Sequence, residues 1–116
     1  MAGDLLISRV RSYSSGTPGR ALNQARTNHF VIDSSHEPEA VSTVESFLAG
    51  VSACGVTLVE GAARSEGLPL QRMEINIEGV RLPSESSVFK EVNMRFQLAG
   101  VSQEQAEQLI QTYRNR

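Results

Sequence analysis

The sequence has few of the features that mark a secreted, membrane-bound or nucleic-acid-binding protein. It has one cysteine, no tryptophan and a net charge of −2 over 116 residues. A single cysteine cannot form a disulfide within the chain, which favours a reducing compartment. The negative net charge gives no electrostatic basis for binding nucleic acid or an anionic membrane surface. These absences predict a cytoplasmic protein with neither nucleic-acid nor membrane partners.

Long hydrophobic runs and a charged leader are also missing. The longest uncharged run, residues 46–59, is too short and too rich in serine and glycine to span a membrane. The first ten residues, "MAGDLLISRV", place no positive charges before a long apolar run, so they do not form a signal peptide. With 40% hydrophobic and 21% charged residues, the chain is predicted to form one globular domain over residues 1–116.

The first third of the chain is predicted to be β-structure. Leu5–Tyr13 has the composition of a strand and ends at the turn-rich "SSGTPGR". The following run, "ALNQARTNHFVID", becomes clearly strand-like at Thr27–Ile32. The two runs can pair as a hairpin across Ser14–Gly19.

A long helix is predicted next, within Ser42–Gly67. Ser42 and Glu45 form the S-x-x-E pattern of a capping box, and apolar residues follow at helical spacing. Two alternating strands then flank "RLPSES", which predicts an antiparallel hairpin. A second capping box, Ser102 with Gln105, opens a final helix. The predicted fold is α+β, with antiparallel hairpins packed on two helices in the order β-β-α-β-β-α.

Cys54 is the first candidate for chemistry, and two interpretations are open. Free cysteine commonly packs as a small buried hydrophobe. A reactive thiol would need an arginine from another segment, because Cys54 lies too deep in its helix for much help from the helix dipole. The two histidines, His29 and His36, show no metal-like spacing with Cys54, so neither a metal nor a cofactor is expected. His29 suits a structural role in a strand, although a cysteine–histidine pair is conceivable.

The segment "STVESFLAGVSAC", Ser42–Cys54, resembles the OsmC/Ohr family, in which it typically reads T-P-x-E-L-L-L-A-A-L-x-S-C. The capping serine, Glu45, Leu48, Ala49 and Cys54 fall in register. The flanks agree in order and length: "RTNHFVID" precedes the helix, and a hairpin and "GVSQEQAEQLIQTY" follow it. The resemblance therefore covers nearly the whole chain.

The resemblance implies an intertwined homodimer with thiol peroxidase chemistry at the subunit interface. Cys54 would attack an organic or hydrogen peroxide, and an external thiol would reduce the product. An arginine would lower the thiol pKa and polarise the peroxide; Arg20 is the best match and Arg26 the alternative. Glu45 and His29 are possible supporting residues.

Two positions depart from the family pattern. The glutamate that orients the arginine in the Ohr group belongs at position 44, where this chain has Val44, and Glu45 is better explained as a helix cap. The family's second cysteine belongs just after the second helix, so either the protein continues past Arg116 or it lacks this residue. An alternative function is therefore a non-catalytic module that binds an apolar small molecule at the interface. A hot-dog-fold thioesterase, using a carboxylate such as Glu45, is a third hypothesis.

Overall fold

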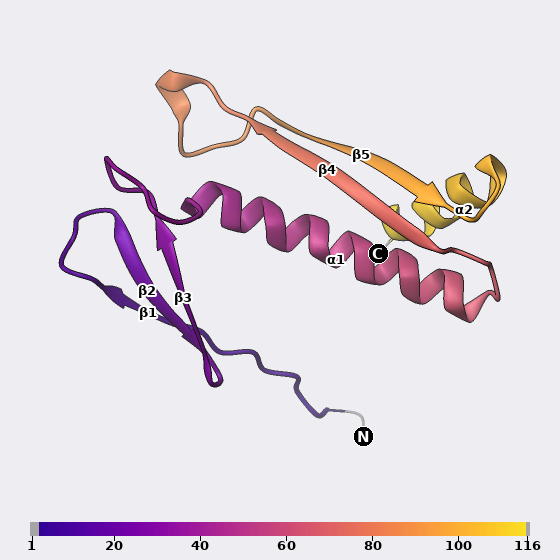
Figure 1. The fold of residues 1–116 in the computed structure, drawn as a ribbon, viewed down its shortest axis with the longest axis horizontal. Coiled ribbons are helices and arrows are strands. Elements are labelled where there is room, and N and C mark those ends of the chain that lie inside the picture. The colour runs from indigo at the N-terminus through magenta and orange to yellow at the C-terminus, as the bar shows by residue number, and fades with distance from the viewer. Residues whose placement is uncertain (1–2, 116) are drawn as a thin grey trace. The chain divides into compact units, whose positions relative to one another are not determined.

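The computed structural model describes residues 3–115, and the chain divides into two compact units, Met1–Ser46 and Phe47–Arg116 (Figure 1). The elements follow the order β1-β2-β3-α1-β4-β5-α2, with a short 3₁₀ turn at Pro83–Glu85. The α+β class and the alternation of hairpins with two helices are confirmed. The structure contains one strand more than the sequence predicts.

The first unit is a three-stranded antiparallel sheet of β1 (Arg11–Ser14), β2 (Arg20–Ala25) and β3 (Asn28–Asp33). The predicted hairpin across residues 14–19 is confirmed, since Ser14 pairs with Ala21. The strand predicted at Leu5–Tyr13 is shorter than expected. Among the described residues, no strand pairs with residues 4–10, and a strand needs a hydrogen-bonding neighbour.

The run "ALNQARTNHFVID" forms two strands, because Arg26 and Thr27 turn the chain between β2 and β3. Arg26 adopts a left-handed conformation, with φ of 57°. The side chain of Asn28 donates a hydrogen bond to the carbonyl of Ala25 and helps to close the turn. Turns of this kind usually carry glycine or asparagine at the left-handed position, so no residue pattern indicates this one.

The second unit contains most of the long helix α1 (Thr43–Ser65), the hairpin of β4 (Arg72–Val80) and β5 (Glu91–Ala99), and α2 (Gln103–Arg114). The alternation predicted for the hairpin is confirmed over most of its length, although Val92 is exposed instead of facing the core. Ser102 and Gln105 form the predicted capping box of α2.

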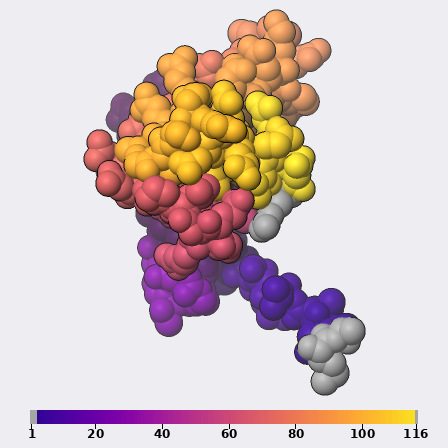
Figure 2. All heavy atoms as spheres, turned by 90° about the vertical axis from the view of Figure 1, so that its right-hand side faces the viewer, coloured from indigo at the N-terminus to yellow at the C-terminus, as the bar shows by residue number. Residues whose placement is uncertain are grey.

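The core of the second unit is small. Val59 and Ala63 of α1 and Leu109 of α2 are the fully buried apolar residues among those described. Half-buried side chains of β4, β5 and α2 pack around them. Figure 2 shows this end of the unit, where the last turns of α1 and the atoms of α2 lie against each other. The core therefore fixes the C-terminal half of α1.

Candidate functional site

Cys54 lies near the middle of α1, about three turns after the helix begins. Its side chain is exposed. The interpretation of Cys54 as a small buried core residue is therefore wrong for this structure. An exposed thiol can meet a soluble oxidant, which a buried structural cysteine cannot do.

Cys54 belongs to an exposed face of α1 that carries no charge. Phe47, Gly50, Cys54, Thr57 and Gly61 follow at intervals of three and four residues and are all exposed; we call them the thiol face. Four of the five side chains are small. The hydroxyl of Thr57 donates a hydrogen bond to the carbonyl of Cys54, 3.1 Å away, so it does not project far from the helix. A second helix can approach such a face closely.

The neighbouring residue, Gly55, fixes the rotation of α1 at this point. Gly55 is buried, and a Cβ atom built on it would lie 2.8 Å from Cδ1 of Ile75 and 3.3 Å from the ring of Tyr113. The Tyr113 ring packs against Phe96, with 5.7 Å between the ring centroids. This close packing on the core side turns Cys54 outward.

Arg20, in the first unit, is held by two carboxylates. Its Nε donates to Oδ2 of Asp33 over 2.8 Å, and one terminal nitrogen donates to Oε1 of Glu39 over 3.3 Å. Asp33 has no exposed side-chain surface, whereas the Glu39 side chain is 80% exposed. The first contact is therefore a partly buried ion pair and the second is a surface one. Sequence reasoning selected Arg20 but missed both acids.

The Asp33 carboxylate also organises the loop that follows β3. Its Oδ1 accepts from the backbone N–H of Ser35 and its Oδ2 from that of Glu39, both at 2.9 Å. The nearby Ser35 hydroxyl is the largest influence that lowers the pKa of Asp33. The Glu39 N–H lowers it further, and burial opposes both. The hydrogen bond to Asp33 raises the pKa of Arg20.

Arg26 and His29 have no comparable surroundings. Arg26 follows the opposite end of β2 from Arg20, roughly 20 Å away along the strand. Its side chain is exposed and forms no ion pair within residues 3–115. His29 is exposed on β3 and makes no side-chain hydrogen bond to a described residue, so the structural role expected for it is not seen. Of the two candidate arginines, Arg20 is the one that the fold holds in place.

Glu45 caps its own helix. Its Oε1 accepts from the backbone N–H of Ser42 over 2.9 Å, and its own N–H donates to Oγ of Ser42 over 3.1 Å. This reciprocal pair is the predicted capping box. Within the described part of the first unit, Glu45 makes no ion pair with Arg20.

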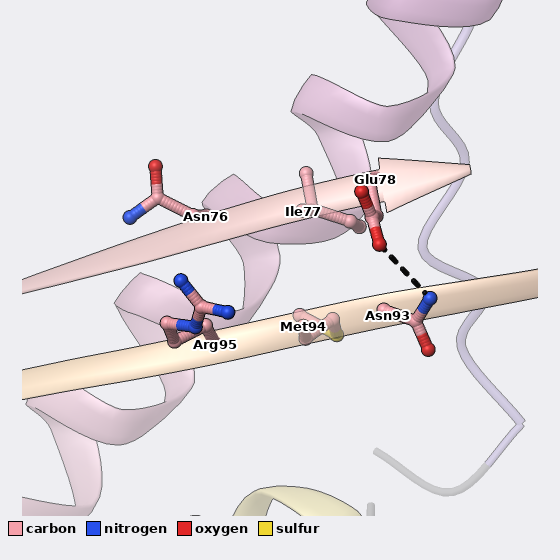
Figure 3. A pocket seen from close by; sticks show the side chains of 6 residues that line it. All are labelled: Asn76, Ile77, Glu78, Asn93, Met94 and Arg95. Carbon is pink, nitrogen blue, oxygen red and sulfur yellow. Dashed lines mark hydrogen bonds between the residues drawn. The ribbon is translucent and has the colours of Figure 1, made fainter. Parts of the chain in front are cut away.

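A shallow depression of about 300 Å³ lies on the β4–β5 hairpin (Figure 3). It is lined by Asn76, Ile77, Glu78, Asn93, Met94 and Arg95. Figure 3 shows polar side chains of both strands projecting from the hairpin, and Asn93 donates a hydrogen bond to Glu78 over 3.1 Å. The lining mixes both charges and includes no cysteine, serine or threonine that could act as a nucleophile.

No group of three or more histidine, cysteine, aspartate or glutamate side chains in residues 3–115 is placed to hold a metal ion. The helix α1 is long and apolar enough to cross a membrane. Core helices of soluble proteins meet the same criterion of length and composition.

No family model matches the sequence, and no curated protein matches it. Solved structures do match the fold. An OsmC-like protein from Mycoplasma pneumoniae superposes with a TM-score of 0.86 at 13% identity, covering 96% of this chain and 82% of that one. An organic hydroperoxide resistance protein OsmC from Legionella pneumophila gives 0.74 at 17% identity, with coverage of 97% and 85%. OhrB of Bacillus subtilis, an organic hydroperoxide resistance protein, gives 0.65 at 16% identity, with coverage of 97% and 86%.

These likenesses extend over nearly the whole chain, and their low identities show the fold alone. They confirm, for the fold, the resemblance to the OsmC/Ohr family that the sequence around Cys54 indicates. The chain therefore has the fold of the OsmC and organic hydroperoxide resistance proteins, at a large distance in sequence from the solved examples.

Proposed function

We propose that the protein is a cytoplasmic, cysteine-dependent hydroperoxide reductase that works as a homodimer, with Cys54 as nucleophile and Arg20 as the activating arginine. The observation that carries the proposal is the exposure of Cys54 on α1. By its register with the OsmC/Ohr sequence pattern, the thiol would stand where the family has its reactive cysteine, and the likeness of the fold to the OsmC and Ohr structures supports the proposal.

The proposed chemistry begins with the Cys54 thiolate. The sulfur attacks one oxygen of the peroxide, and an S–O bond forms as the O–O bond breaks. The sulfur is oxidised to a sulfenic acid, while the released alkoxide takes up a proton and leaves as an alcohol, or as water from hydrogen peroxide. Two molecules of an external thiol then return the sulfenic acid to the thiol, giving water and a disulfide of the reductant. Arg20 stabilises the negative oxygen that develops as the O–O bond breaks.

The proposal of a homodimer rests on apolar surface that the described chain leaves uncovered. Only 17% of the most apolar 18-residue window of α1 is buried. Large apolar side chains are exposed in both units, among them Leu5, Leu6, Ile7, Val10 and Phe47. Large apolar side chains that a chain leaves exposed mark an interface with a partner. A second copy is the occupant we propose, because the thiol face is uncharged and mostly made of small residues. Two α1 helices can then cross closely around Cys54 and leave the thiol in a pocket at the interface, open to the peroxide.

The rate of Cys54 oxidation tests the proposal directly. Purified protein is mixed with cumene hydroperoxide or hydrogen peroxide from about pH 5 to about pH 9, and sulfenic acid is trapped and quantified. We expect a fast reaction whose rate is already saturated below about pH 7, and no trapped product from Cys54→Ser. A slow reaction that rises through about pH 8.5, as for a small thiol, would overturn the proposal.

A non-catalytic module that binds an apolar small molecule is the second candidate. It is favoured by Phe47, which is 58% exposed and stacks on Phe89 with 5.9 Å between ring centroids, two helical turns before Cys54. The Cys54→Ser variant distinguishes the two functions. A binding module would retain its affinity for a fluorescent apolar probe after this substitution, and the wild type would show no fast peroxide reaction.

A further inference from the structure

The buried carboxylate of Asp33 marks an anchoring point in the first unit. Asp33 ends β3 and stands opposite Arg20 in the register of β2 and β3. Its two oxygens accept three hydrogen bonds, from Nε of Arg20 and from the backbone N–H groups of Ser35 and Glu39. A carboxylate is costly to bury unless its oxygens are paired in this way. The pairing therefore fixes the Nε edge of Arg20 to the sheet.

The other edge of the Arg20 guanidinium is held loosely. One terminal nitrogen reaches the exposed carboxylate of Glu39 at 3.3 Å, a long contact of the kind that contributes little in water. The other terminal nitrogen, Nη1, has no partner among residues 3–115. A guanidinium has five N–H donors in one plane, so anchoring through Nε leaves four that can meet a ligand. The Arg20 side chain keeps 24% of its surface exposed.

We propose that Asp33 is the positioning residue of Arg20: it holds the guanidinium through Nε, so that the terminal nitrogens receive a peroxide oxygen, and Glu39 is an acceptor that the peroxide displaces. This inference rests on the proposed function. In the OsmC/Ohr resemblance, a glutamate at position 44 would orient the arginine, but this chain has Val44 there. The proposal assigns that orienting role to Asp33, at the end of β3. Glu45, the nearest acid, is committed to the helix cap.

A double-mutant cycle on the rate of Cys54 oxidation tests whether Asp33 acts through Arg20. We expect Asp33→Asn to lower the second-order rate constant roughly 10- to 100-fold, with Arg20→Ala lowering it at least as much. In the Arg20→Ala background, Asp33→Asn should change the rate less than about twofold. Effects that multiply in the double variant would overturn the proposal, because Asp33 would then act independently of Arg20.

The two contacts of Arg20 can be separated with a matched pair of variants. Glu37 is an exposed acid of the same loop with no contact to Arg20, so Glu37→Ala is the control and should leave the rate unchanged. Glu39→Ala should leave the rate at saturating peroxide unchanged and lower the peroxide KM, since it removes the competing acceptor. A loss as large as that of Asp33→Asn would overturn the assignment of Glu39 as displaceable.

Two further measurements test the proposal even if Asp33→Asn does not fold. Arg20→Lys retains the charge without the Nε fork, and we expect it to lose rate as Arg20→Ala does. A wild-type rate in Arg20→Lys would overturn the proposal. In the wild type, the Nε–H of Arg20 should exchange with water more slowly than that of the exposed Arg26, as followed by NMR. Equal exchange would overturn the anchoring itself. A slow wild-type reaction with peroxide overturns the proposed function instead, and leaves this NMR comparison to decide whether Asp33 anchors Arg20.

Discussion

Arg20 and Asp33 are joined by a hydrogen bond of 2.8 Å from Nε to Oδ2, and the carboxylate side chain has no exposed surface. The pair links the first residue of β2 to the last residue of β3. The same carboxylate accepts two backbone N–H groups of the following loop. Loss of the charge at Asp33 therefore affects the end of the hairpin and the loop together.

Asp33→Asn should destabilise the protein in a manner that depends on pH. The Ser35 hydroxyl, the Glu39 N–H and Arg20 hold the pKa of Asp33 below its ordinary value of about 3.9. A carboxylate with a depressed pKa stabilises the fold above its unfolded pKa, and this contribution disappears as the pH falls through the folded pKa. We expect the urea midpoint of Asp33→Asn to lie below that of the wild type at neutral pH. The difference should shrink as the pH falls below about 4.

Glu37→Gln is the matched control for that experiment, because it removes an exposed acid from the same loop without touching Asp33. Its urea midpoint should follow the wild type at every pH. A deficit of Asp33→Asn that is the same at neutral and acidic pH would contradict the role assigned to the ionised carboxylate.

Variants of Glu45 test whether its carboxylate serves the helix cap or the peroxide reaction. Glu45→Gln should preserve both the stability and the rate of Cys54 oxidation, because glutamine serves equally in a capping box. Ser42→Ala should lower the free energy of unfolding by about 1 kcal/mol, since it removes the acceptor for the N–H of Glu45. The measurements are urea denaturation and the oxidation rate. If Glu45→Gln lost as much rate as Arg20→Ala, the carboxylate would belong to the reaction and not to the cap.

The helix boundaries and the second hairpin could be predicted from the sequence because local rules decide them. Both capping boxes and the alternation of β4 appear in the structure as the residue patterns indicate. The turn at Arg26 could not be predicted, because a non-glycine residue adopts the left-handed conformation there.

The candidate site was predicted only in part, for a different physical reason. Cys54 and Arg20 were selected by their register with a family pattern. The acids that hold Arg20 depend on how β2 pairs with β3 and how the loop after Asp33 folds back, and a linear pattern contains neither. The exposure of Cys54 follows from the burial of its neighbour Gly55, which is also a tertiary effect.

Gly55→Ala should destabilise the protein even though alanine favours a helix by about 1 kcal/mol. The new Cβ would lie 2.8 Å from Cδ1 of Ile75, and such overpacking costs about 1–3 kcal/mol. We expect a net loss of about 1 kcal/mol by urea denaturation. Ile75→Val removes the Cδ1 atom and should recover part of the loss, so that the double variant is more stable than the sum of the single effects predicts. If the destabilisations of the two single variants simply add in the double variant, then the Cδ1 atom of Ile75 does not cause the steric clash.

Thr57→Arg should separate the proposed dimer into monomers. Thr57 lies on the thiol face one turn after Cys54, and a long charged side chain there would keep two α1 helices apart and leave its charge unpaired between them. Glu60→Arg is the matched control, because Glu60 is an exposed residue of the same helix outside the thiol face. Sedimentation equilibrium should show a dimer for the wild type and for Glu60→Arg, and a monomer for Thr57→Arg with its helical circular dichroism retained. If the wild type sediments as a monomer, or if Thr57→Arg remains a dimer, then two α1 helices do not pack through the thiol face.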